Sequence, residues 1–149
     1  MKIENQLTNL DLSKELEKLG VPQKSIWMWV KYELWKEPRI ELSDLVSEIK
    51  MTCLSGKREY AYSAFSCAEI GEMLPVTIEM KNETHWFDCN KTVYWHRCGY
   101  IWIHEGSSGW GQLDNSQTDH SHSVGRAKTE ADCRAKMLIY LLKNELVDP

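Results

Sequence analysis

The stretch "SIWMWVKYELW", residues 25–35, alternates between two sets of side chains and therefore predicts a β-strand. One set is apolar and suited to a core, namely Ile26, Met28, Val30, Tyr32 and Leu34. The other set combines indoles with charges, namely Trp27, Trp29, Lys31, Glu33 and Trp35. The second face of a half-buried strand is ordinarily polar. The indoles are therefore either covered by another element or form a contact surface, and we expect a contact surface.

A helix is predicted on the N-terminal side of this strand. Leu12, Leu16 and Leu19 recur at helical spacing, and Gly20 followed by a proline predicts the end of the helix. The stretch "TNLD" resembles a capping box that begins at Thr8, and Ser13 is an alternative start.

The C-terminal stretch predicts the strongest helix of the chain. Thr129 and Asp132 supply its cap, and an apolar stripe follows at helical spacing. The stripe consists of Ala131, Ala135, Leu138, Ile139, Leu142 and Leu146. Such a stripe requires a sheet or another helix over it, so we expect this helix to be the main cover of the sheet.

The middle of the chain is less uniform. Residues 39–56 fit either a short helix from Ser43 to Lys50 or a strand that begins at Ile40. "REYAYSAF", residues 58–65, alternates and predicts a strand. Ser66 and Glu69 then form a capping box, and the helix that they begin ends before a proline.

Three alternating stretches after residue 75 predict an antiparallel meander. They are "VTIEM" at residues 76–80, "HWFDC" at 85–89 and "VYWHRCGYIWIH" at 93–104. Residues 106–128 are polar and predict a long loop. The expected fold class is α+β in a single domain, residues 1–149, with a twisted antiparallel sheet of about five strands. An N-terminal helix, a short central helix and a long C-terminal helix pack on this sheet.

Composition narrows the possible functions. The chain has 149 residues and a net charge of -4, which disfavours tight binding to duplex DNA. It contains no signal-peptide pattern and no apolar run long enough to span a membrane, so we expect a cytoplasmic protein. The five cysteines are an odd, widely spaced set without a C-x-x-C motif, and we expect all of them to be free thiols.

Motifs for catalysis and metal binding are incomplete. Ser108 lies in the glycine-rich "GSSGWG", but no helix is predicted after it, as a nucleophile elbow requires. Asp119, His120 and His122 cluster in the polar loop without a further ligand at zinc spacing. We therefore expect no bound metal and no cofactor.

Tryptophan is the most unusual feature of the composition, with seven residues against two phenylalanines. Indoles are frequent in binding hot spots, and planar bases stack on them for about 1–3 kcal/mol each. Basic residues beside them can neutralise phosphates. The predicted binding surface consists of Trp27, Trp29, Lys31, Trp35, Trp95, Arg97, Trp102, Trp110 and Arg126.

Two stretches resemble patterns in small uncharacterised proteins of phages and integrated mobile elements of gut-type bacteria. They are "AYSAFSCAEIGEMLP", residues 61–75, and "TEADCRAKMLIYLLKNEL", residues 129–146. The resemblance lies in helix-packing residues and leaves out the tryptophan-rich segments. It implies an accessory or host-takeover context and no particular chemistry.

These observations favour a non-catalytic binding protein of a phage or mobile element. It would counter host defence by sequestering a nucleotide-derived signal or by blocking a host protein. One alternative is an enzyme acting on a nucleotide-like substrate, with an acid/base drawn from His96, His104, His120 and His122. The other is a structural or assembly protein whose aromatic residues form the interface of a homo-oligomer.

Overall fold

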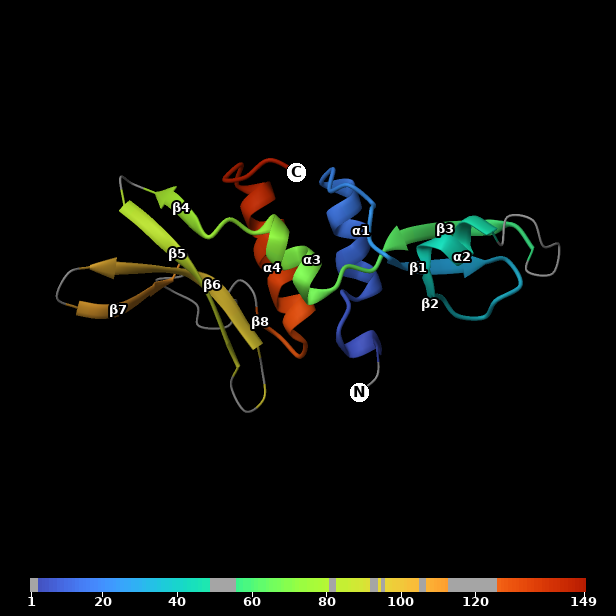
Figure 1. Cartoon of the computed structure of the whole chain (residues 1–149), viewed down its shortest axis with the longest axis horizontal. Coiled ribbons are helices and arrows are strands. Elements are labelled where there is room, and N and C mark those ends of the chain that lie inside the picture. Colours follow the sequence, from blue (N-terminus) through green and yellow to red (C-terminus); the bar gives the residue numbers. More distant parts are fainter. Residues whose placement is uncertain are drawn as a thin grey trace.

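Hydrogen bonding sorts the described strands into two antiparallel sheets, where the sequence predicts one, and the α+β class is confirmed. In the computed structural model, helices α1, α3 and α4 lie between the two sheets (Figure 1). The structure describes residues 3–48, 56–80, 83–91, 94, 96–104, 107–112 and 126–149. Its elements are η1 (Ile3–Asn5), α1 (Leu10–Lys18), β1 (Trp27–Tyr32), β2 (Arg39–Leu42), α2 (Ser43–Glu48), β3 (Arg58–Ser63), α3 (Cys67–Met73), β4 (Thr77–Met80), β5 (Glu83–Lys91), β6 (His96–His104), β7 (Ser107–Gln112), β8 (Arg126–Ala127) and α4 (Glu130–Lys143).

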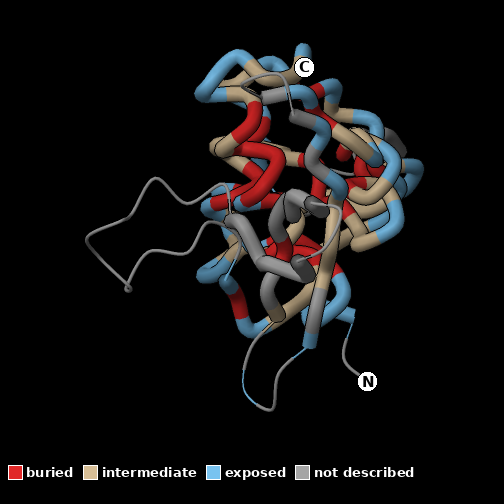
Figure 2. The backbone as a smooth tube through the Cα atoms, turned by 90° about the vertical axis from the view of Figure 1, so that its left-hand side faces the viewer, coloured by how far each residue is buried: buried red, intermediate tan, exposed pale blue. Residues whose placement is uncertain are grey.

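The largest core cluster lies in the helical layer. In Figure 2, which looks along the long axis of the molecule, buried helical segments lie inside a rim of exposed turns. Leu16 of α1, Ile70 of α3 and Leu141 of α4 are fully buried in this cluster. Helix α4 contacts α1 and α3 as well as β6 and β8. It therefore buries Cys133, Met137 and Leu141 in addition to part of the predicted stripe, because it has neighbours on more than one side.

The first sheet has the strand order β2-β1-β3 and a small core of its own. Val30 and Tyr32 of β1 pack with Val46 of α2 in this core. Two residues expected in the core are instead exposed. The exposed fraction is 61% for Ile26 and 68% for Leu34. The reason is that β1 is shorter than the alternating stretch, so Ile26 precedes the strand and Leu34 follows it in a turn.

Residues 39–56 contain both elements that the sequence left open. Residues 39–42 form β2 and pair with β1, and α2 begins directly at Ser43. The described part of this helix ends at Glu48.

The helix caps agree with the sequence in two cases and differ in one. Ser66 and Glu69 form the predicted capping box of α3, and the Thr129 hydroxyl caps α4. Helix α1 is capped by Asn9, whose side chain accepts from the Leu12 N–H at 3.1 Å, so the predicted start at Thr8 or Ser13 is wrong. The Thr8 hydroxyl is instead buried, 2.9 Å from the Ser13 hydroxyl and 3.0 Å from the Phe65 N–H, which donates to it.

The second sheet has the order β4-β5-β6-β7, with β8 paired to β6. The predicted meander is therefore confirmed and extended by further strands. Residues 107–112, expected in the polar loop, form β7, and residues 126–127 form β8. Residues 113–125 of the predicted loop lie outside the described residues.

Two cysteines are joined, against the expectation of free thiols. Cys89 and Cys98 face each other on β5 and β6, with 4.2 Å between their Cα atoms, and form a disulfide. Their spacing in the sequence matches no cysteine motif, but the hairpin places the two positions opposite each other. Cys67 and Cys133 are thiols, and Cys53 lies outside the described residues. None of the described helices has the length and apolar character needed to cross a membrane.

Candidate functional site

The indoles of the first strand do not share one face. The alternation ends at Tyr32, where the register shifts and a turn begins, so Trp35 packs against the core that Val30 and Tyr32 form. The Trp35 ring meets the Tyr32 ring edge-on at 4.8 Å, and the guanidinium of Arg39 lies 4.9 Å from its centre. The prediction that Trp35 lies opposite this core is therefore wrong.

Trp27, Trp29 and Lys31 remain on the other face of β1, and all three are half-buried. The Trp29 indole N–H donates to the backbone carbonyl of Thr8 at 2.8 Å, which fastens the segment before α1 to the sheet. The Lys31 ammonium lies 3.5 Å from a carboxylate oxygen of Glu59. These contacts favour a packing role for Trp29, and binding by this face stays a prediction.

The remaining predicted binding residues lie on the other sheet or outside the described part of the chain. Arg126 is exposed on β8 and is the register partner of Arg97 on β6. The backbone of Trp102 lies in β6 and that of Trp110 in β7, while Trp95 is not among the described residues. The side chains of Arg97, Trp102 and Trp110 are likewise not described. The predicted residues are thus divided between two sheets with the helical layer between them (Figure 1).

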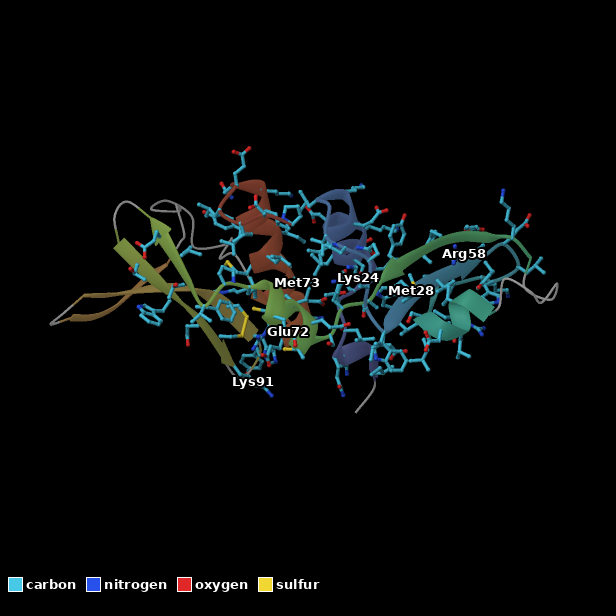
Figure 3. All side chains as sticks on the ribbon, turned by 45° about the horizontal axis from the view of Figure 1, so that its top comes forward. Lys24, Met28, Arg58, Glu72, Met73 and Lys91 are labelled. Atoms are coloured by element: carbon cyan, nitrogen blue, oxygen red, sulfur yellow. A yellow bond between two sulfur atoms is a disulfide. The ribbon has the colours of Figure 1, made fainter. Side chains whose placement is uncertain are left out.

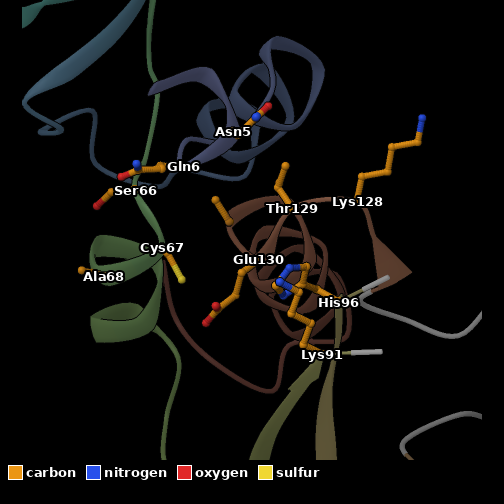
Figure 4. A pocket seen from close by; sticks show the side chains of 11 residues that line it. Asn5, Gln6, Ser66, Cys67, Ala68, Lys91, His96, Lys128, Thr129 and Glu130 are labelled. Atoms are coloured by element: carbon orange, nitrogen blue, oxygen red, sulfur yellow. The ribbon is translucent and has the colours of Figure 1, made fainter. Parts of the chain in front are cut away.

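A pocket of about 710 Å³ lies elsewhere, where the N-terminal segment, the starts of α3 and α4 and one end of the β5–β6 hairpin meet (Figure 4). Its lining residues come from parts of the chain that are distant in sequence. They are Asn5, Gln6, Ser66, Cys67, Ala68, Lys91, His96, Lys128, Thr129, Glu130 and Ala131. None of these is a tryptophan, tyrosine or phenylalanine.

Three basic side chains line this pocket. Lys91 and His96 are direct register partners at the end of the hairpin, so their side chains lie next to each other. Figure 4 shows both beside Glu130, whereas Lys128 points away from them. The first turn of α4 also borders the pocket, and the N-terminus of a helix carries partial positive charge. These groups together favour an anion.

The one acidic residue of the lining, Glu130, is already compensated. It accepts hydrogen bonds from Nε and Nη2 of Arg134 at 2.9 Å and 2.6 Å. A hydrogen bond from the Cys67 thiol, the Arg134 guanidinium and the charge of His96 together outweigh burial and lower the pKa of Glu130. Gly71 makes room for this arginine, because a Cβ at that position would lie 2.6 Å from one of its nitrogens.

Cys67 is not placed as a nucleophile. Burial and the hydrogen bond to Glu130 raise the pKa of its thiol to about 11. A reactive cysteine requires a lowered pKa, because the thiolate is the nucleophile. At neutral pH, Cys67 is therefore a protonated hydrogen-bond donor within the lining.

Most of this pocket was not predicted from the sequence. The sequence predicts His96 as an acid/base of the alternative enzyme, and Ser66 and Thr129 as helix caps. The available signal was the pair of predicted caps, since each marks a helix N-terminus. Where those two helices begin relative to each other is not encoded in either local pattern.

Among the residues that the structure describes, no group of three or more His, Cys, Asp or Glu side chains is arranged to hold a metal ion. Asp119, His120 and His122 lie outside that part of the chain. No protein-family model, curated protein or solved structure matches the chain. The resemblance to phage proteins therefore stays a prediction.

Proposed function

We propose that this protein is a non-catalytic binding protein that captures a small phosphate-bearing molecule in the pocket at the start of α4. The observation that carries the proposal is that Lys91 and His96 lie side by side in one pocket beside a helix N-terminus, with Lys128 also in its lining. Its volume, about 710 Å³, falls within the range of about 300–1,000 Å³ typical of ligand sites. Phosphates bind readily where a helix N-terminus and cationic side chains meet.

The charge balance supports an anionic ligand. The chain as a whole carries a net charge of -4, so a basic pocket is a local departure from its average. Because Glu130, the only carboxylate among the described lining residues, is paired with Arg134, it does not cancel the charges of Lys91 and Lys128.

The proposal keeps the nucleotide-derived ligand that the sequence predicts. Asn5 and Gln6 offer amide donors and acceptors at the same pocket, which suits the polar groups of a nucleotide-derived molecule. Stacking on tryptophan does not carry the proposal, because none of the described lining residues is a tryptophan. The phage or mobile-element context, the host cytoplasm and a host immune signal as ligand rest on the likeness of the two helical stretches alone.

Calorimetric titration tests this proposal with three probes: inorganic phosphate, a nucleoside monophosphate and the same nucleoside without phosphate. We expect binding of the two phosphate-bearing probes and much weaker binding of the nucleoside. Lys91→Ala should weaken phosphate affinity at least about tenfold, because a hydrogen bond to a charged group contributes about 1.5–3 kcal/mol. Lys128→Ala should weaken it less, because the Lys128 side chain points away from Lys91 and His96.

The matched control is Lys24→Ala, which removes the same charge from an exposed position away from the lining. An equal loss of affinity in this variant would mean that the effect comes from the overall charge of the protein, and it would refute the site. The nucleotide recovered after denaturation should be unchanged. Recovery of a hydrolysed or transferred product would favour the enzyme, with His96 as the nearest acid/base candidate.

A further inference from the structure

We propose that Cys89 and Cys98 form a redox-modification site that sets the anion affinity of the pocket by ordering Lys91. This inference rests on the proposed function, since it concerns the same pocket. The pairs Cys89–Cys98 and Lys91–His96 are register partners on the same hairpin, two positions apart. Residues two apart on a strand point to the same face, so the disulfide lies directly beside the side chains of Lys91 and His96. Figure 3 shows the yellow sulfur–sulfur bond close to Lys91 at the end of the hairpin.

The two strands of the hairpin are held unequally. On β6, Cys98 is 1% exposed and packs with Ala127 and Cys133, and His96 pairs with Ala127 of β8. On β5, the register with β4 ends at Trp86, and the Phe87 N–H donates to the Val76 carbonyl next to it. Beyond that point the register of β5 through Lys91 is with β6, and Cys89 packs against the cluster of Cys98, Ala127 and Cys133. Residues 92–95 join Lys91 to His96 along the chain, and the disulfide is a second covalent link between the two strands, two positions from Lys91.

The two cysteines differ in how easily a small-molecule disulfide can reach them. Cys89 is half-buried whereas Cys98 is buried, so a small-molecule disulfide such as oxidised glutathione reaches Cys89 first. The Cys89 thiolate attacks one of its sulfurs and releases one glutathione thiolate, which takes up a proton. The Cys98 thiolate then displaces the second glutathione. Two protein thiols are thereby oxidised, and one disulfide is reduced to two thiols.

The disulfide affects anion binding because it limits the conformational freedom of the last residues of β5. In a reducing compartment a disulfide of this kind is transient and responds to redox conditions. Without the cross-link, the last residues of β5 gain conformational freedom that an anion must remove when it binds Lys91. Fixing even one residue corresponds to a factor of about ten in affinity. Oxidation is therefore expected to strengthen anion binding, and reduction to weaken it.

The test is the affinity for inorganic phosphate after oxidation with glutathione disulfide and after reduction with dithiothreitol. Mass spectrometry of alkylated protein confirms each thiol state, and circular dichroism confirms the fold. We expect wild-type affinity to fall about tenfold on reduction. Cys89→Ser should bind like the reduced protein under both conditions.

Two lysine variants locate the effect. Lys91→Ala should bind phosphate weakly and lose its redox response. Lys128→Ala should bind phosphate more weakly than wild type but keep the full ratio of affinities between the oxidised and reduced states. Equal wild-type affinity in both confirmed states, or an undiminished redox response in Lys91→Ala, would overturn this inference and leave the proposed function standing. Absence of phosphate binding in either state would instead refute the proposed function itself.

Discussion

The helical layer and the three-stranded sheet are held by cores of very different size. The cluster of the helical layer contains 12 buried residues, which come from α1, α3, α4, their flanking segments and strand β4. The cluster of the three-stranded sheet contains three, Val30, Tyr32 and Val46, with partly buried neighbours around them. Because apolar burial is the main source of stability, the helical layer should determine global unfolding and the sheet should open more easily.

The junction between the two regions is largely polar. Thr8, Ser13, Ser25 and Ser63 are buried there. The Ser25 hydroxyl donates to the carbonyl of Ala64 at 3.1 Å, and the Ser63 N–H donates to the side-chain oxygen of Gln23 at 2.7 Å. Each such bond contributes about 1 kcal/mol net, but leaving a buried partner unsatisfied costs more. The three-stranded sheet is therefore attached by specific hydrogen bonds more than by a continuous apolar core.

The largest expected effect lies in the helical layer. Leu138 is 2% exposed, and Leu138→Ala should lower the free energy of unfolding by about 2–5 kcal/mol, because a cavity replaces buried methyl groups. Urea denaturation measures this loss. The control Leu34→Ala, at a position 68% exposed, should change stability by no more than about 0.5 kcal/mol. Equal losses at both positions would remove the contrast between the two regions.

A smaller effect is expected in the core of the three-stranded sheet. Val46 is 2% exposed, and Val46→Ala should cost about 1.5–2.5 kcal/mol for two lost methyl groups and a small cavity. Hydrogen exchange should accelerate at the amides of β1 and β3 but not in α4. The matched control is the neighbouring Leu45→Ala, at a position 43% exposed on the same helix. Equal acceleration in α4 would mean that both regions unfold as one unit.

Trp29 connects the two regions. Trp29→Phe keeps an aromatic ring but removes the donor to the Thr8 carbonyl, so we expect a loss of about 1–2 kcal/mol in unfolding free energy. Trp27→Phe is the control, because no side-chain hydrogen bond of Trp27 is present among the described residues. Phosphate affinity per folded molecule should be unchanged in both variants. A loss of affinity at constant stability would restore the predicted contact role of these indoles.

The smallest effect is expected at the cap of α3, and it depends on pH. Burial alone would raise the pKa of Glu69, but hydrogen bonds from the Ser66 hydroxyl and from the N–H groups of Ser66 and Ile26 lower it overall. A lowered folded-state pKa stabilises the protein above the unfolded pKa of about 4.3, and this contribution is lost as the pH falls through the folded value.

Ser66→Ala should therefore cost about 1 kcal/mol at pH 7. The difference from wild type should shrink in urea denaturation curves as the pH falls through the lowered folded-state pKa of Glu69 and its carboxylate takes up a proton. A difference that stays constant down to acid pH would show that the carboxylate does not take part in this cap.

Local patterns determined much of this protein. The helix of Leu12 and Leu16, the capping box of Ser66 and Glu69, the Thr129 cap and the meander follow from residues a few positions apart. Helical periodicity, capping bonds and hairpin alternation act over one or two turns or between adjacent strands. A single chain therefore displays them without reference to its tertiary neighbours.

Which elements become neighbours is visible in the tertiary structure alone. Alternation in residues 25–35 predicts two faces, but it does not reveal that the strand ends at Tyr32 or that Trp35 then packs on the apolar side. The Cys89–Cys98 bond depends on strand register, and the pocket depends on α4 beginning beside the end of a hairpin. These positions result from competition among all the buried surfaces of the chain, and no short stretch of sequence contains that information.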